Sequence, residues 1–220
     1  MPKAFTEHEK EWIGARLLEA GYKQFSAYGL KKANVEELAK AAGISKGAFY
    51  LFYESKEALF MDVVEGAEKH FRQELLAVID QPGPSPRARL LAVFKKAFSL
   101  WKTIPVLQFF TQGDYELLFR RLPADKFEEH LASDRRFFEE LVTRCQQAGI
   151  PIQAPAEEIN NLMYLILLAS LNQEGFGPGY LASSMDVLLE LVAAFCLGEV
   201  TIQPAQALTV TKDNDDEPGY

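Results

Sequence analysis

Apolar side chains recur at the spacing of an α-helix along most of the chain. In the first such stretch, Thr6 and Glu9 form a capping box that starts a helix, and Gly29 ends this helix after residue 28. Beyond residue 84 the pattern shows no strand-like alternation. Further helices are predicted over 35–42, 46–52, 55–79, 85–101, 104–111, 114–121, 124–148, 155–174 and 181–197. The fold class that follows is all-α.

The stretch from residue 34 to residue 56 contains two short helices joined by a tight turn. Asn34 can cap the first helix, and Glu37 can reach back to complete a capping box. Gly43 supplies the left-handed backbone conformation that stops this helix, and Ser45 can cap the second. A helix, a short turn with glycine and a second helix form the helix-turn-helix arrangement, whose second helix enters the major groove of DNA.

The second of these helices begins with a small, basic turn, Lys46-Gly47-Ala48, which allows its backbone to approach another macromolecule closely. Its second half, Phe49 to Tyr53, is nearly all apolar or aromatic, which is more than one buried face needs. Capped short helices separated by glycine also occur in helical domains that do not bind DNA. The capping pattern alone therefore leaves both interpretations open.

The region from about residue 16 to residue 60 resembles the DNA-binding domain of the TetR family of bacterial transcriptional regulators. Gly21 stands where the family usually has alanine, which should weaken the first helix by about 1 kcal/mol. Phe52 stands where the family usually has His or Tyr, and it cannot donate a hydrogen bond to a phosphate. The matching residues are Leu17-Leu18-Glu19-Ala20, Phe25, Gly29, Leu38-Ala39, Ala42-Gly43-Ile44-Ser45-Lys46-Gly47, Phe49-Tyr50 and Ser55-Lys56-Glu57-Ala58-Leu59-Phe60.

The resemblance implies an N-terminal three-helix helix-turn-helix DNA-binding domain over 1–54 and a larger helical ligand-binding and dimerisation domain over 55–200. The helix over 55–79 would link the two domains, and the polar tail over 201–220 is expected to be disordered. The expected function is that of a ligand-responsive transcriptional regulator. It would act as a repressor that binds a pseudo-palindromic, double-stranded operator as a homodimer and is released by a small apolar or cationic molecule.

Candidate DNA contacts lie in and around the second helix of the motif. Lys46 is the best candidate for a base or phosphate contact, and Tyr50 would reach the phosphate backbone. Lys56 lies at a helix N-terminus, where the dipole disfavours a cation, so we expect it to bind a phosphate. The helix has no Arg, Asn or Gln for a bidentate base contact, which leaves thymine methyl groups and DNA shape to carry specificity. The predicted DNA-binding residues are Asn34, Ser45, Lys46, Gly47, Ala48, Tyr50 and Lys56.

The net charge of −8, taken alone, argues against DNA binding. Residues 1–56, however, carry nine Lys and Arg against seven Asp and Glu, whereas the rest of the chain carries 14 against 24. Local charge governs the attraction to phosphates, and an acidic bulk limits non-specific association. The distribution of charge is therefore compatible with DNA binding at the N-terminal end.

Residues 98–119 are dense in aromatic side chains, most of which could simply form a core. Trp101, Gln108 and Tyr115 nevertheless carry polar tips that a plain core rarely contains, and an apolar cavity with a few polar groups is typical of a small-molecule site. Polar residues of the helix over 155–174 could line the same cavity or bond across a subunit interface. The predicted effector-binding residues are His70, Trp101, Gln108, Phe109, Phe110, Tyr115, Phe119, Tyr164 and Asn172.

The helices over 155–174 and 181–197 are apolar on more than one face. Such helices must be covered on every side, so they lie either at the centre of the domain or against a second chain. A four-helix interface in a two-fold homodimer fits this pattern. We therefore expect these two helices to form the dimer interface.

Enzyme chemistry finds little support in the sequence. The three histidines, His8, His70 and His130, fall on three different predicted helices without metal-ligand spacing, and no phosphate-binding glycine loop or nucleophile elbow is present. We expect no catalytic residues, no metal and no cofactor. Cys145 and Cys196 are expected to be buried free thiols. The sequence contains neither a transmembrane run nor a signal peptide, so a cytoplasmic protein is expected. The alternative is a helical ligand-binding domain or enzyme with a helix-turn-helix-like N-terminus.

Overall fold

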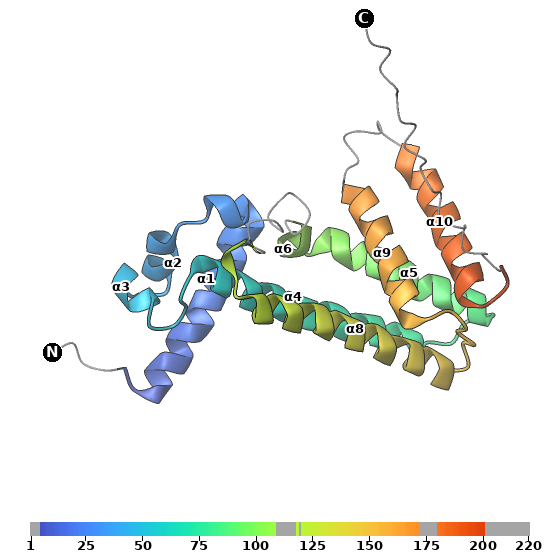
Figure 1. Cartoon of the computed structure of the whole chain (residues 1–220), viewed down its shortest axis with the longest axis horizontal. Helices are drawn as coiled ribbons and strands as arrows, with labels where there is room; N and C mark the ends of the chain where they lie inside the picture. The colour runs from blue at the N-terminus through green and yellow to red at the C-terminus, as the bar shows by residue number, and fades with distance from the viewer. Residues whose placement is uncertain (1–4, 109–117, 119, 172–179, 201–220) are drawn as a thin grey trace, which may run out of the picture.

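The computed structural model describes residues 5–108, 118, 120–171 and 180–200. Every regular element in these ranges is a helix, which confirms the all-α prediction (Figure 1). The predicted helix over 114–121 and the tail over 201–220 lie largely or wholly outside the described residues. The helices are α1 (Glu7–Lys32), α2 (Val35–Ala41), α3 (Lys46–Phe49), α4 (Lys56–Ile79), α5 (Pro86–Thr103), α6 (Pro105–Gln108), α8 (Ala124–Gln147), α9 (Ala156–Leu171) and α10 (Tyr180–Cys196).

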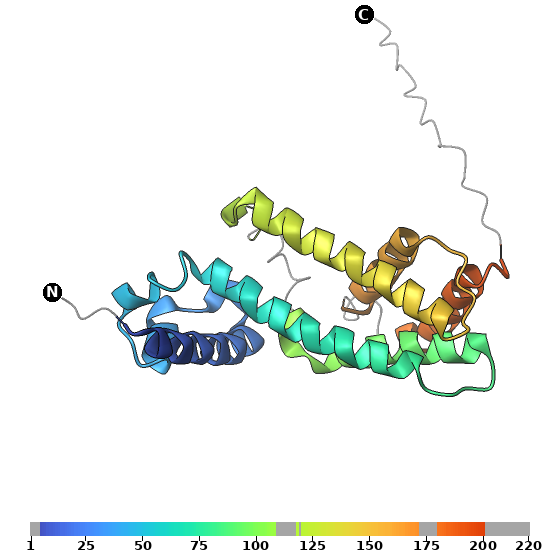
Figure 2. The ribbon, with the colours of Figure 1, turned by 90° about the horizontal axis from the view of Figure 1, so that it is seen from below.

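The described helices form a small head and a longer body (Figures 1 and 2). Helices α1, α2 and α3 make up the head, and α4 runs from the head along the body with α8 beside it. Helices α5, α9 and α10 gather at the end of the body farthest from α3. Within the described ranges, no helix is both long enough and apolar enough to cross a membrane.

Three helix starts follow the sequence closely. The capping box of α1 is complete, since Thr6 N–H donates to Glu9 Oε2 at 2.7 Å and Glu9 N–H donates to Thr6 Oγ1 at 3.2 Å. Ser55 Oγ accepts the Ala58 N–H at 3.1 Å at the start of α4, and Ser85 caps α5 in the same way. Each cap satisfies backbone donors that the first helical turn leaves without a partner.

The start of α2 differs from the prediction in one contact. Asn34 does cap the helix, because its Oδ1 accepts the Glu36 N–H at 2.9 Å. The carboxylate of Glu37, however, accepts a hydrogen bond from Gln24 Nε2 at 3.3 Å and closes no capping box. The Asn34 N–H donates instead to Gln24 Oε1 at 3.3 Å. A side chain of α1 thus replaces the local partner and ties α1 to α2.

Two hydrophobic cores share helix α4. The first core joins α1, α2 and α3 to the first half of α4 and also includes residues 104–107, 118 and 122, so it crosses the predicted boundary after residue 54. The second core joins the last turns of α4 to α5, α8, α9 and α10. Cys145 and Cys196 are buried in it as free thiols, as predicted, and burial raises their pKa values to about 11 and about 12. A displacement of α4 therefore acts on both cores.

Gly21 allows α1 to lie close to α4. A Cβ atom at this position would lie 3.0 Å from Val63 Cγ2, 3.1 Å from Phe25 and 3.3 Å from Leu59. These separations are shorter than ordinary van der Waals contact, so an alanine here requires its neighbours to move. The glycine that lowers the helix propensity of α1 also allows the close packing of the two helices.

Two glycines of the head should respond to alanine in opposite ways. Gly43 has a φ of 78°, and the left-handed conformation costs a residue with a Cβ about 1–2 kcal/mol. Gly14 lies within α1, where an added Cβ would meet nothing within 4 Å, so Gly14→Ala should stabilise the fold by about 0.5–1 kcal/mol. Urea unfolding monitored by circular dichroism measures both changes. Shifts of the two midpoints in the same direction would contradict this account.

Candidate DNA interface and effector chamber

The second helix of the motif, α3, is shorter than the sequence predicted. Ser45 Oγ accepts the Ala48 N–H at 3.2 Å and caps the helix as expected. The helix ends at Phe49, not at residue 52, because the carbonyl of Phe49 accepts the N–H groups of both Phe52, at 2.9 Å, and Tyr53, at 3.0 Å. The chain then turns toward the start of α4.

Phe49 anchors α3 to the rest of the head. Its side chain is fully buried, with ring contacts to Tyr50 at 5.4 Å and to Tyr53 at 6.0 Å between centroids. Lys46 and Gly47 are exposed, Tyr50 is 50% exposed, and Leu51 is 75% exposed. The helix therefore holds one side chain in the core and presents basic, aromatic and aliphatic groups outward. The sequence did not single out Leu51, although the excess of apolar residues in this stretch was its signal.

The turn between α2 and α3 is held from two sides. Gly43 N–H donates to Lys40 O and Ile44 N–H donates to Ala39 O, both at 3.0 Å, so the predicted glycine stop is present. Arg16 of α1 donates Nη2 to the Ala41 carbonyl at 2.8 Å. These bonds occupy carbonyls at the C-terminus of α2 that would otherwise lack partners. They fix the angle at which α3 leaves the head.

Lys56 does not occupy the place expected of a phosphate anchor. Its Nζ donates to three backbone carbonyls, those of Leu30 at 2.8 Å, Lys31 at 3.1 Å and Ala33 at 3.0 Å. An ammonium group has three protons, so these bonds use its whole donor capacity. The lysine closes the junction between α1 and α2, where Gly29 has a φ of 72°. Its role in this structure is to hold the head together.

A chamber of about 360 Å³ lies in the body between α4, α5, α8 and α9. Trp101 and Tyr164, two of the predicted effector residues, line it. Trp101 Nε1 is buried and has no hydrogen-bond partner among the described residues, which leaves a donor in the wall. The apolar lining consists of Phe71, Leu75, Val93, Phe94, Ala97, Leu107, Leu131, Phe137, Phe138, Leu141, Met163 and Leu167.

Other predicted effector residues do not line the chamber. His70 is exposed and stays out of its wall, because α4 turns Phe71 and Leu75 toward the chamber. Gln108 donates Nε2 to the Lys102 carbonyl at 2.6 Å and closes the loop between α5 and α6. Neither residue therefore lines the chamber, and their contact with an effector stays a prediction. Phe109, Phe110, Tyr115, Phe119 and Asn172 lie outside the described residues.

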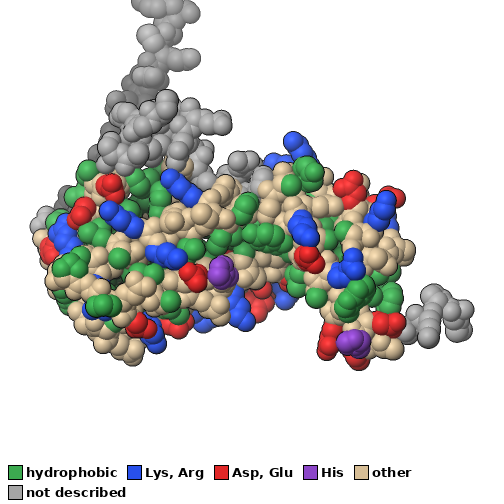
Figure 3. Space-filling view, turned by 180° about the vertical axis from the view of Figure 1, so that it is seen from behind, with side chains coloured by type: hydrophobic (Ala, Val, Ile, Leu, Met, Phe, Trp, Pro, Cys, Tyr) green, Lys and Arg blue, Asp and Glu red, His purple; other side chains and the backbone are tan. Residues whose placement is uncertain are grey.

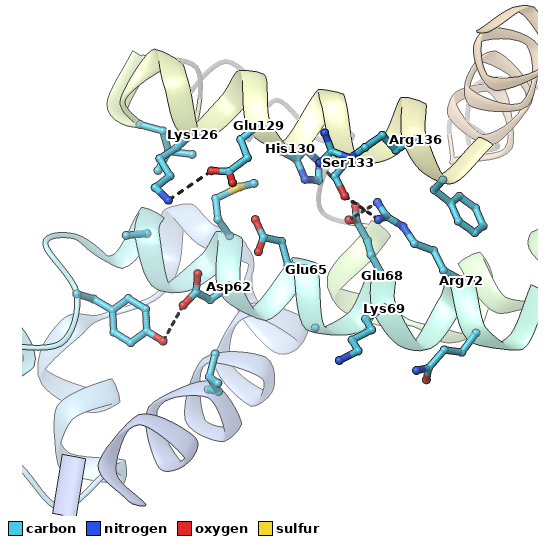
Figure 4. Close-up of a pocket in the computed structure, with 18 of the residues that line it drawn as sticks. Asp62, Glu65, Glu68, Lys69, Arg72, Lys126, Glu129, His130, Ser133 and Arg136 are labelled. Carbon is cyan, nitrogen blue, oxygen red and sulfur yellow. Dashed lines mark hydrogen bonds and ion pairs between the residues drawn. The ribbon is translucent and has the colours of Figure 1, made fainter. Parts of the chain in front are cut away.

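Glu68, Arg72, His130 and Asp134 close one end of the chamber, and Ser133 bonds Arg72 beside them. These five residues are here called the polar cluster, and Figure 4 shows Glu68, Arg72, His130 and Ser133. Arg72 Nη2 donates to Asp134 Oδ1 at 2.7 Å and to Glu68 Oε2 at 3.2 Å. Its Nη1 donates to Ser133 Oγ at 2.8 Å. The polar cluster thereby joins α4 to α8.

The carboxyl of Glu68 is the most strongly perturbed acid of the polar cluster. Burial, and after it the charge of Asp134, raises the pKa of Glu68 to about 8, although Arg72 acts in the opposite direction. Buried His130 places Nε2 at 3.7 Å from Glu68 Oε1 and at 3.9 Å from Asp134 Oδ2. One ligand atom from each of these three side chains lies within 4.8 Å of the others, as a metal site would require. The guanidinium of Arg72 already bonds both carboxylates, so a metal ion would have to displace it.

A wider groove of about 1360 Å³ also runs between α4 and α8 and reaches the head (Figure 4). Glu68, Arg72, His130 and Phe137 line both the groove and the chamber. At the end near the head, the Tyr53 hydroxyl donates to Asp62 Oδ2 at 3.0 Å, and burial raises the pKa of this phenol. The polar cluster is thus a shared wall between an open polar groove and an apolar chamber.

The outer surfaces of α9 and α10 expose several large apolar side chains. Leu165 of α9 is 61% exposed, and Val187 and Leu191 of α10 are 59% and 56% exposed. Charged side chains of both signs are interspersed with apolar ones on the face of the body shown in Figure 3. Exposed apolar residues on two neighbouring helices mark a surface suited to another protein chain.

The capped helix pair, its glycine turn and the short exposed helix α3 define a helix-turn-helix DNA-binding domain. Residues 17–63 match the family model of bacterial regulatory proteins of the tetR family. This match confirms, for the N-terminal domain, the resemblance to the TetR family found in the sequence.

The curated relatives that match are named as transcriptional regulators of the helix-turn-helix type. YdgC of Bacillus subtilis is 38% identical over 58 residues, which is 26% of this chain and 30% of that protein. YuxN of the same organism is 39% identical over 80 residues, covering 36% of this chain and 26% of that protein. AcrR of Shigella flexneri is 31% identical over 65 residues, or 30% of each chain. The matches therefore span less than a third of the length of these relatives.

Solved structures resemble the chain over most of its length. FadR from Bacillus subtilis, solved in complex with stearoyl-CoA, gives a TM-score of 0.58 at 19% identity and covers 82% of this chain and 97% of that one. FadR from Bacillus halodurans gives a TM-score of 0.59 at 16% identity and covers 87% and 97%. At these identities the likeness establishes the fold, which includes the helical body as well as the head.

Proposed function

We propose that the protein is a ligand-responsive transcriptional regulator, a repressor that binds a pseudo-palindromic operator as a homodimer and is released by a small apolar or cationic molecule. The observation that carries the proposal is that α4 belongs to both the core of the helix-turn-helix head and the wall of the chamber. A ligand in the chamber can therefore act on the head through one continuous helix. Such a regulator works on DNA in the cytoplasm and needs no catalytic residue.

In the DNA complex, two α3 helices related by the two-fold axis enter successive major grooves, about 34–36 Å apart. Lys46 contributes the charge that contacts phosphate or a base edge, and Ser45, Gly47 and Ala48 let the backbone approach. Tyr50 donates its hydroxyl to the phosphate backbone. The exposed Leu51 adds an aliphatic group that can contact a thymine methyl.

The homodimer forms through α9 and α10, whose exposed apolar residues then pack against their copies in the second chain. A two-fold interface of this kind uses the same surface on both partners, so four helices meet at the axis. Because each head occupies one half-site, the spacing of the two α3 helices depends on how both bodies are held together.

Release requires the effector to bind one arrangement of α4 more tightly than the other. A preference of about 100-fold corresponds to about 2.7 kcal/mol of coupling free energy. FadR from Bacillus subtilis, which shares the fold, was solved with stearoyl-CoA, and this supports a ligand-binding role for the body. At the joint of head and body, buried Glu57 of α4 lies 3.5 Å from Arg121 Nη1, so the two parts also share an ion pair.

The operator contact of Lys46 is tested by its salt dependence. Fluorescence anisotropy against the upstream DNA of the gene, with a scrambled duplex as control, should show selective, salt-sensitive binding. Lys46→Ala should weaken this binding about tenfold and reduce the slope of log affinity against log salt by about 0.9, the share of one phosphate contact. Lys95→Ala removes the same charge from α5, far from the head, and should change neither value. Equal effects of the two substitutions would refute a direct contact.

The alternative function is a helical ligand-binding domain or enzyme whose helix-turn-helix does not bind DNA. No binding to either duplex at low salt would favour it. Equal binding to both duplexes would place the operator elsewhere in the genome.

A further inference from the structure

We propose that the chamber is built for an organic cation, with an apolar body among the aromatic side chains and an ammonium group against Glu68 and Asp134. This inference rests on the proposed function, in which the chamber holds the effector. It narrows the effector from a small apolar or cationic molecule to an organic cation with an apolar body. The evidence for this inference is the charge of the polar cluster and the aromatic side chains that line the chamber next to it.

The polar cluster contains one carboxyl more than its fixed cation can neutralise. Glu68 and Asp134 both face Arg72, and their side chains are only 17% and 34% exposed. The guanidinium itself is 21% exposed, so water screens these charges poorly. Burying an ionised carboxylate without a partner costs free energy. Unpaired buried acids of this kind are commonly found at sites where a ligand supplies the missing positive charge.

The perturbation of Glu68 agrees with this count. Its pKa of about 8 means that the carboxyl holds a proton near neutral pH, chiefly because it is buried and secondly because Asp134 lies beside it. An ammonium group placed next to Glu68 would stabilise the carboxylate and displace that proton.

On α4 the charged groups next to Glu68 are Glu65 and Arg72. Across the chamber, the charged and polar side chains are those of Trp101 on α5, His130, Asp134 and Arg135 on α8, and Glu157, Asn160, Asn161 and Tyr164 on α9, and Ser133 of α8 lines the adjoining groove. Arg135 is exposed and, among the described residues, forms no hydrogen bond to Glu68, so Arg72 is the cation that bonds this carboxyl.

The walls next to the polar cluster favour a cation with an apolar body. Phe71 and Trp101 meet edge to face at 6.5 Å, and Phe137 and Phe138 lie 5.6 Å apart, all four lining the chamber. The ring of Phe137 already has the guanidinium carbon of Arg72 at 5.2 Å from its centre. Aromatic faces attract cations, so the same surface suits an ammonium group and the methylenes attached to it.

A cation at this place would also act on α4. Its ammonium group competes with Arg72 for Glu68 and Asp134, and the bond from Arg72 to Asp134 joins α4 to α8. Loss of this bond lets the two helices separate at the point where the groove and the chamber share a wall. Binding and the position of α4 are thereby linked.

The test uses three probes of one shape, phenylbutylamine, phenylbutanol and phenylbutyrate, titrated calorimetrically into the full chain at pH 8. The amine should bind at least about tenfold more tightly than the alcohol, and phenylbutyrate should bind most weakly. Glu68→Gln should remove most of the preference for the amine and leave the affinity for the alcohol unchanged. Glu74→Gln, on the same helix but outside the chamber and paired with Lys96, is the matched control and should keep the preference.

The proton balance gives a second readout. Below the pKa of Glu68 the carboxyl must lose its proton as the amine binds, so the affinity for the amine should rise up to about tenfold from pH 6 to pH 7. Phosphate and Tris have different ionisation enthalpies. The binding enthalpies measured at pH 7 in these two buffers should therefore differ by the amount that corresponds to the release of nearly one proton. Glu68→Gln should abolish this release.

Four results would overturn the inference: equal or tighter binding of the alcohol, tightest binding of phenylbutyrate, an amine preference that survives Glu68→Gln, or no amine binding at millimolar concentration. The same preparation is assayed with operator DNA, which separates the two proposals. If the amine binds as described but DNA does not, the cation site stands and the regulatory function falls. If DNA binds and the amine does not, the reverse holds.

Discussion

Glutamate at both Leu165 and Leu191 should convert the protein into a monomer with at least about 100-fold weaker operator binding. These residues are 61% and 56% exposed on α9 and α10, and in the proposed dimer each would be buried against the second chain. Burying an unpaired carboxylate costs several kcal/mol, which exceeds what the rest of such an interface can offset. A monomer also loses the gain in affinity from occupying two half-sites together. Sedimentation velocity measures the assembly, and anisotropy measures the operator affinity.

The control for this substitution is Tyr28→Glu, which adds the same charge at a 60% exposed aromatic residue of α1 in the head. It should leave the sedimentation coefficient of the dimer unchanged. A wild-type monomer, or a double variant that still sediments as a dimer, would show that α9 and α10 are not the interface.

Lys56→Met should destabilise the protein by about 2 kcal/mol, in the range measured for hydrogen bonds that involve a charged group. The three carbonyls of Leu30, Lys31 and Ala33 would lose their donor, and methionine preserves the length and most of the volume of the side chain. Urea unfolding measures this loss. Operator affinity should fall only to the extent that the head unfolds. The slope of log affinity against log salt should stay unchanged, because Lys56 makes no phosphate contact.

The comparison with Lys46→Ala separates the two roles of lysine in the head. Because Lys46 is exposed, Lys46→Ala should reduce the slope of log operator affinity against log salt and leave the free energy of unfolding within about 0.5 kcal/mol of the wild type. If Lys56→Met instead kept full stability and gave the shallower slope, the phosphate role expected from the sequence would be restored.

Features governed by neighbours in the chain could be predicted from the sequence. The caps at Thr6, Ser55 and Ser85 and the left-handed Gly43 depend on contacts only a few residues long, and all four are present. The partners of Lys56 lie 23 to 26 residues away, and the partner of Glu37 lies 13 residues away. For both side chains the local pattern suggested a nearby or external partner, whereas the tertiary fold supplied one.

The sequence predicted that the body contains an apolar cavity with a few polar groups, but it identified only some of the residues that line the chamber. Trp101 and Tyr164 could be found because their polar tips are unusual on apolar helices. The apolar stripe of α4 predicts an inward His70, whereas the helix turns this residue to the surface. Arg72 and Asp134 are separated by 62 residues, so their pairing depends on how α8 packs against α4 and leaves no periodic signal.

The length of α4 determines how far a small movement in the body displaces the head. Its 24 residues, at about 1.5 Å each, make a rigid rod of about 36 Å, with one end in the core of the head and the other in the core of the body. A tilt of about 5° at the body end moves the far end by about 3 Å, roughly the length of one hydrogen bond. A side-chain rearrangement as small as the exchange of one ion-pair partner can therefore be amplified into a mismatch between a reading head and its half-site.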